Sequence, residues 1–178
     1  VWDLHVVDHE LWVPWDGGAI PCTISFGFAH GRKCYFIEPR SSQDFFDRGT
    51  YYGFPDDAER FAFFSKAALE FLLKTGKRPD VIHTHDWQTG LVPVLLHEIY
   101  SAAGLADQRV CHTIHNFRHQ GVTGPEILRA TGLGRPDYFG APDRMKLGTA
   151  MSLSGSCPTA WCSRTVAKLP ARAHSTAP

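Results

Sequence analysis

Two short segments of the chain place histidine beside an acidic or amide side chain, directly after an apolar run. The first segment holds His83, His85 and Asp86, and the second holds His115 and Asn116. Imidazole, carboxylate and amide groups together supply the hydrogen-bond donors and acceptors that a polyhydroxylated ligand needs. The residue types therefore predict a polar binding site that contains both groups.

The elements around these residues should bring the two groups together. The β-branched runs 80–85 and 109–114 predict strands, and the amphipathic segment 89–103 between them predicts a helix. A strand–helix–strand crossover makes the two strands parallel, and it is right-handed in nearly all known proteins. Neighbouring strands end about 5 Å apart, at the edge where open α/β sheets bind ligands. We therefore expect the two polar groups to share one crevice.

Each polar group has a second interpretation. His83, His85 and Asp86 have the residue types and spacing of zinc or iron ligands, but no further ligand with a fixed partner is evident. We therefore expect no metal, and we interpret His83 as a buried, hydrogen-bonded histidine. Asp86 could be only the N-cap of the next helix, and His115 with Asn116 could be ordinary loop residues. The flanking His85 and Trp87 favour ligand binding for Asp86, and the following Gln120 with two glycines favours it for His115 and Asn116.

Composition limits the class of protein. The chain has 178 residues, of which 43% are hydrophobic, and this suits one globular domain with a substantial core. Eighteen basic residues balance eighteen acidic ones, so no charge pattern indicates a nucleic-acid or membrane-surface partner. The apolar stretches are shorter than the roughly 20 residues that cross a bilayer. No phosphate-binding loop or dinucleotide fingerprint is present, so no cofactor is expected.

The remaining segments predict the surroundings of the site. Segments 4–7, 20–26 and 33–38 have the pattern of short strands, and 56–75 has that of a helix. Asp56 and Glu59 have the spacing of a reciprocal N-terminal cap for this helix. Its apolar stripe is expected to comprise Phe61, Phe64, Ala68, Phe71 and Leu72.

The composition changes after residue 145, where Ala, Ser, Thr, Pro and Arg become dominant. Neither helical nor strand periodicity continues beyond that point. We therefore expect one domain over 1–145 and an irregular or aberrant tail over 146–178. Because the chain begins at Val1 rather than Met, we also expect natural N-terminal residues to be missing.

Several separated motifs resemble those of the starch synthases and bacterial glycogen synthases. They are 78–90, 113–116 and 120–121, together with 46–49, 52–53 and 57–61 upstream, all in the same order. The segment from His115 to Gly121, with 127–132, most resembles the cyanobacterial and plant type III/IV branch. The resemblance covers about residues 1–145, and an ordered set of motifs is more specific than a single pattern.

The resemblance to this family, glycosyltransferase family 5, implies an α/β fold: a Rossmann-like, mostly parallel sheet that is the incomplete N-terminal half of a GT-B enzyme. It also implies transfer of glucose from ADP-glucose to the non-reducing end of an α-1,4-glucan, with retention of configuration. The implied catalytic residues are Asp86 and His115, and the implied substrate-binding residues are Asn116, Tyr52, Gln120 and His85. The location would be the plastid (chloroplast or amyloplast) for a plant or algal source, and the cytoplasm for a bacterial one.

Two parts of the family pattern are absent from the sequence. They are the Lys-x-Gly-Gly loop that touches the nucleotide sugar and the C-terminal domain that supplies most ADP contacts. The chain alone is therefore expected to have little activity. Two alternatives remain open: a non-catalytic glucan-binding domain, and a metal-dependent hydrolase that uses His83, His85 and Asp86.

Overall fold

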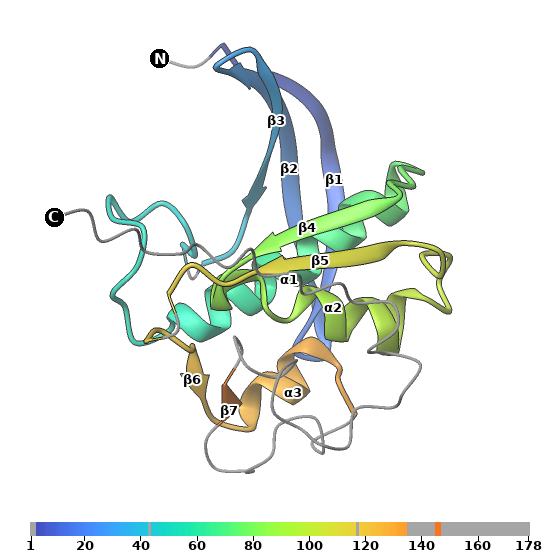
Figure 1. Ribbon diagram of the computed structural model, residues 1–178. Helices are drawn as coiled ribbons and strands as arrows, with labels where there is room; N and C mark the ends of the chain where they lie inside the picture. The colour runs from blue at the N-terminus through green and yellow to red at the C-terminus, as the bar shows by residue number, and fades with distance from the viewer. Residues whose placement is uncertain (1–2, 43, 117, 135–144, 147–178) are drawn as a thin grey trace, which may run out of the picture.

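The computed structural model describes residues 3–42, 44–116, 118–134 and 145–146. The described elements lie in the order shown in Figure 1. They are β1 (His5–Trp15), β2 (Gly18–Ala29), β3 (Arg32–Pro39), α1 (Asp57–Lys74), β4 (Val81–His85), η1 (Trp87–Thr89), α2 (Val92–Leu95), η2 (Leu96–Tyr100), β5 (Arg109–Thr113), β6 (Val122–Thr123), α3 (Glu126–Thr131) and β7 (Met145–Lys146).

The strands β4 and β5 form the parallel pair that the sequence predicts. The register runs from Val81 opposite Arg109 to His85 opposite Thr113. The connection between them contains the 3₁₀ turn η1, the α-helical turn α2 and the π-helical turn η2. Pro93 fits because it lies in the first turn of α2, where its missing N–H would have no helical partner. The α/β class and the Rossmann-like crossover are therefore confirmed.

The expectation of a mostly parallel sheet holds only for this pair. β1, β2 and β3 form a separate antiparallel sheet, and β6 pairs antiparallel with β7. Asp16 and Gly17 join β1 to β2, and both have positive φ, as do His30 and Gly31 between β2 and β3. Such tight turns can join only antiparallel neighbours, whereas a parallel pair needs a long crossover.

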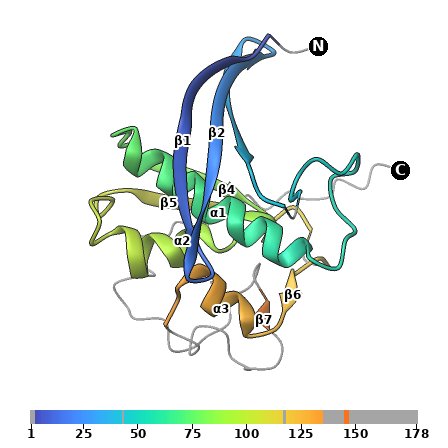
Figure 2. The same ribbon diagram turned by 180° about the vertical axis from the view of Figure 1, so that it is seen from behind.

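The helix α1 lies between the antiparallel sheet and the β4–β5 pair (Figures 1 and 2). It contacts β1 and β3 on one side and η1, α2 and α3 on others. Phe63 is fully buried, with its ring centroid 5.3 Å from that of Trp15 and 5.1 Å from that of Phe45. Among the described residues, no helix is long and apolar enough to span a membrane.

Two expectations about α1 are wrong. Phe64, placed in the buried stripe, is 37% exposed, whereas Phe63 and Leu69 are fully buried. The helix has sheets on two sides, so a single stripe does not describe its buried surface. Asp56 makes no side-chain cap, because both of its carboxylate oxygens accept hydrogen bonds from the Arg48 guanidinium, each at 2.7 Å. The bidentate hydrogen bonds to the charged guanidinium are stronger than a hydrogen bond to a neutral backbone N–H would be.

A side-chain hydrogen bond also joins β4 to β5. The Thr84 hydroxyl and His112 Nδ1 lie 2.8 Å apart. Burial lowers the pKa of His112 below its ordinary 6.5; the nearby imidazoles of His85 and His83 act in the same direction, while Asp86 opposes them. His112 is therefore neutral in the folded protein at neutral pH.

We expect Phe63→Ala to lower the free energy of unfolding by about 3–5 kcal/mol, because it leaves a cavity between α1 and the antiparallel sheet. Phe28→Ala is the control, since Phe28 is 61% exposed. That change should cost about 0.5 kcal/mol or less. Urea denaturation followed by circular dichroism measures both. Equal losses in the two variants would contradict the observed core.

The free energy of unfolding should fall as the pH is lowered from about 7 to 5. In this range the unfolded chain binds a proton at His112 that the folded chain excludes, because the folded pKa is the lower one. His112→Asn should reduce this pH dependence, and His30→Asn, on an exposed turn, is the control. Denaturant titrations at each pH give the slopes. An unchanged slope in His112→Asn would refute the assignment.

Candidate functional site

Asp86 joins the ends of the two parallel strands. Its backbone N–H donates to the carbonyl oxygen of Thr113 at 2.9 Å, which continues the β4–β5 ladder by one residue. Its carboxylate Oδ1 accepts the backbone N–H of His115 at 2.7 Å and that of Asn116 at 3.4 Å. The structure thus brings together the two polar groups that the sequence placed in one crevice.

The N-cap interpretation of Asp86 is wrong for its side chain. Asp86 precedes η1, but its carboxylate makes no hydrogen bond to that turn. Its backbone has φ 56° and ψ −177°, a conformation that residues other than glycine rarely adopt. Such a conformation persists only where surrounding contacts hold it, and it is common at functional sites. The carboxylate is therefore directed at the loop after β5 rather than at its own helix.

Three histidines line the same strand ends. His85 Nδ1 lies 3.0 Å from His115 Nε2, and the two rings are stacked with their centroids 5.3 Å apart. The His83 ring centroid lies 4.2 Å from that of His85, and His83 Nε2 contacts the Thr113 hydroxyl at 2.8 Å. His83 is hydrogen-bonded as expected, but it is exposed rather than buried, because one face of β4 is uncovered in the described chain.

The His85 side chain is neutral at neutral pH. The pKa of His85 is lowered by desolvation first and then by the neighbouring imidazoles of His83 and His115, while Asp86 opposes the shift. A hydrogen bond between two imidazole nitrogens requires one to donate and the other to accept. His85 Nδ1 and His115 Nε2 therefore take opposite roles, and His85 orients the side chain of His115.

The geometry gives no support to the metal-dependent hydrolase. Within the part of the chain that the structure describes, no group of three or more His, Cys, Asp or Glu residues is placed to hold a metal ion. His83 and His85 instead use ring nitrogens to contact Thr113 and His115. Asp86 uses Oδ1 for backbone N–H groups. The arrangement is a hydrogen-bonding site.

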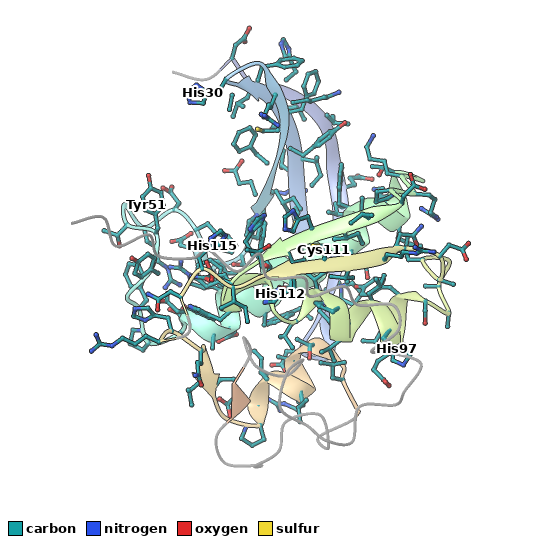
Figure 3. All side chains as sticks on the ribbon, in the orientation of Figure 1. His30, Tyr51, His97, Cys111, His112 and His115 are labelled. Carbon is teal, nitrogen blue, oxygen red and sulfur yellow. The ribbon has the colours of Figure 1, made fainter. Side chains whose placement is uncertain are left out.

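Tyr52 lies on a separate loop before α1. Its side chain is 67% exposed, and this loop lies on the side of the molecule toward which β4 and β5 point (Figure 1). Figure 3 labels the adjacent Tyr51 on this loop and His115 at the strand ends. No contact of Tyr52 with the strand-end residues is observed in the described chain, so its membership of the site stays a prediction.

A buried arginine fixes that loop. Arg60 is 1% exposed and donates from Nη2 to the Tyr51 carbonyl oxygen at 2.6 Å. Its guanidinium lies 5.1–5.4 Å from the ring centroids of three phenylalanines, Phe46, Phe54 and Phe61. Arg48 adds the ion pair to Asp56. These contacts hold the backbone of the loop while its tyrosine side chains face solvent.

Several residues that build the site were not identified from the sequence. The Thr89 hydroxyl contacts both the backbone N–H and the carbonyl oxygen of His85, each at 2.7 Å. Thr113 supplies a carbonyl to Asp86 and a hydroxyl to His83. Gly121, next to the predicted ligand residue Gln120, packs directly on the Trp87 ring. Among these residues, only Thr89 could have been identified from the sequence, because it follows the strand-end His85 by four residues.

Comparisons with known proteins identify the family of the chain. The family model for the starch synthase catalytic domain matches residues 2–167. Glycogen synthase 1 of Synechococcus sp. (strain JA-3-3Ab) is 65% identical over 146 residues, covering 82% of this chain and 30% of that protein. The probable starch synthase 4 of Arabidopsis thaliana is 42% identical over 144 residues, 81% of this chain and 14% of that protein.

A solved structure has the same fold. The catalytic domain of starch synthase IV from Arabidopsis thaliana, bound to ADP and acarbose, has a TM-score of 0.78 and 40% sequence identity. The match covers 84% of this chain and 32% of that domain. The chain thus spans about a third or less of the proteins that it matches. It belongs to the family of starch synthase catalytic domains.

Proposed function

We propose that this chain is the N-terminal part of a retaining glucosyltransferase that transfers glucose from ADP-glucose to the non-reducing end of an α-1,4-glucan. The observation that carries the proposal is the Asp86 carboxylate, which lies between two parallel strand ends and beside the His85–His115 pair. Family membership supports the reaction class. The likeness to a starch synthase bound to ADP and acarbose supports a nucleotide sugar and a glucan as substrates.

We assign the catalytic roles to Asp86 and His115. Glucosyl transfer passes through an oxocarbenium-like transition state, which a nearby carboxylate and fixed hydrogen-bond donors stabilise. In this assignment Asp86 keeps Oδ1 for the backbone N–H groups and presents Oδ2 to the sugar. His115 is oriented by His85.

The substrate-binding roles go to Asn116, Tyr52, Gln120 and His85. Asn116 and Gln120 belong to the loop that follows β5, and Tyr52 is exposed on the loop before α1. Amide and hydroxyl groups at such positions suit sugar hydroxyls. The donor and acceptor are the substrates, and no resident cofactor is part of the proposal.

The remaining assignments concern the rest of the protein. We propose a domain over 1–145, and an irregular segment over 146–178, most of which lies outside the described residues. The second half of the active site would come from a C-terminal domain, so the chain alone should have little activity. The proposed compartment is the plastid for a plant or algal source and the cytoplasm for a bacterial one.

In a full-length synthase that contains this chain, Asp86→Asn should lower kcat/KM by about a hundredfold to a thousandfold. The amide keeps an Oδ1 acceptor for the His115 N–H but makes a neutral, weaker hydrogen bond, so the free energy of unfolding should fall by only about 1 kcal/mol. His115→Ala should also lower kcat/KM while leaving its backbone bond to Asp86 in place. Glucose incorporation from ADP-glucose into glucan measures each variant.

Asp107→Asn is the control for Asp86→Asn, because Asp107 is exposed on the connection before β5. It should leave kcat/KM unchanged. Near-normal turnover in Asp86→Asn would reduce Asp86 to a structural residue. A full-length protein that binds glucan but transfers no glucose would favour the glucan-binding alternative.

A further inference from the structure

We propose that Gly121 is a positioning residue, whose contact with Trp87 fixes the described residues of the loop after β5, 114–116 and 118–121. The loop carries His115, Asn116 and Gln120, so its importance for glucosyl transfer rests on the proposed function. The contact itself is a feature of the fold and can be tested separately. Without it, the candidate ligand residues would be fixed only at the strand end.

The space beside Gly121 is filled by the Trp87 ring. A Cβ atom on Gly121 would overlap Cε3 of Trp87 and would lie 2.7 Å from Cδ2 and 3.0 Å from Cζ3 of the same ring. Carbon atoms in contact are normally about 3.5–4.0 Å apart. All three atoms belong to one rigid indole, so rotation about a flexible chain end cannot relieve the overlap. Any side chain on Gly121 must move either the ring or the loop.

The Trp87 ring is supported on its other side. It packs edge-on against Phe61 of α1, with the ring centroids 5.3 Å apart and the planes at 85°, and it packs against the hydrophobic core. The backbone carbonyl of Trp87 accepts the Gly90 N–H at 3.1 Å, which closes the η1 turn. We therefore expect a side chain on Gly121 to displace the loop more than the ring.

Two adjacent residues thus hold the two ends of one loop. Asp86 binds its beginning through the His115 N–H, and Trp87 contacts its end at Gly121. Asn116 and Gln120 lie between these points. The loop is therefore fixed to a single turn of the chain, at the end of β4. This turn determines where the candidate ligand residues of the loop lie.

Positive φ alone does not explain the glycine. Gly121 has φ +59°, which favours glycine by itself. Gly76, at the end of α1, has the similar φ of +67°, yet a Cβ there would meet no atom within 4 Å. Alanine at Gly76 therefore introduces only the backbone cost, whereas alanine at Gly121 introduces that cost and the overlap. The two positions form a matched pair.

Amide hydrogen exchange tests the proposal on the chain itself. Gly121→Ala should raise the exchange rates of the His115 and Asn116 amides by about tenfold or more, because their bonds to Asp86 open locally. The Asp86 amide, bonded to Thr113 within the ladder, should keep its protection. Gly76→Ala should leave the His115 amide protected. Equal exchange at His115 in the two variants would overturn the proposal.

A second substitution separates the overlap from other effects. In a Trp87→Leu background the indole is gone, so adding Gly121→Ala should cause little further increase in His115 exchange. Additive increases would show that the two residues act independently and would overturn the proposal. If Gly121→Ala alone does not fold, recovery of folding in the double variant supports the contact, and failure to recover refutes it. None of these outcomes depends on which reaction the full-length protein catalyses.

Discussion

The site depends on the hydrogen bond between the Asp86 carboxylate and the His115 amide. The bond is charge-assisted and short, 2.7 Å, and such bonds are about twice as strong as neutral ones. It holds the chain after β5 against the end of β4 and opposes the strain of a non-glycine residue at φ 56°. Backbone strain of this kind costs roughly 1–3 kcal/mol. Without the carboxylate, the two strand ends would still be neighbours but their loops would not be joined.

The parallel pair was predictable because the residue patterns of the two strands and of the segment that connects them are sufficient to predict it. The β-branched runs 80–85 and 109–114 and the crossover between them determine direction, and direction determines that the strand ends are adjacent. The burial of α1 was not predictable in the same way. Phe63 and Phe64 are neighbours of the same type, and only the antiparallel sheet on one side of the helix decides which is buried. Likewise, the Asp56 carboxylate has two competing donors, and Arg48, outside the helix and eight residues earlier, supplies the stronger one.

The site was predictable in its residue types more than in its contacts. His85, Asp86, His115 and Asn116 follow from the strand ends. The bond between His85 and His115 depends on ring orientation and on the bend of the loop, and no pattern in the sequence encodes these. Gly121 is a similar case. Its sequence neighbours indicate a turn, but the reason for glycine is a ring that lies 34 positions earlier in the chain.

The protonation state of His85 bears on the proposed glucosyl transfer. A protonated His85 would place a positive charge beside Asp86 and would oppose the electrostatic effect of its carboxylate. The lowered pKa of His85 keeps that ring neutral at neutral pH, and its hydrogen bond to His115 fixes its orientation. In the proposed reaction, the Asp86 carboxylate would stabilise positive charge that develops at a sugar carbon, and a fixed, neutral His85 would add orientation without opposing it.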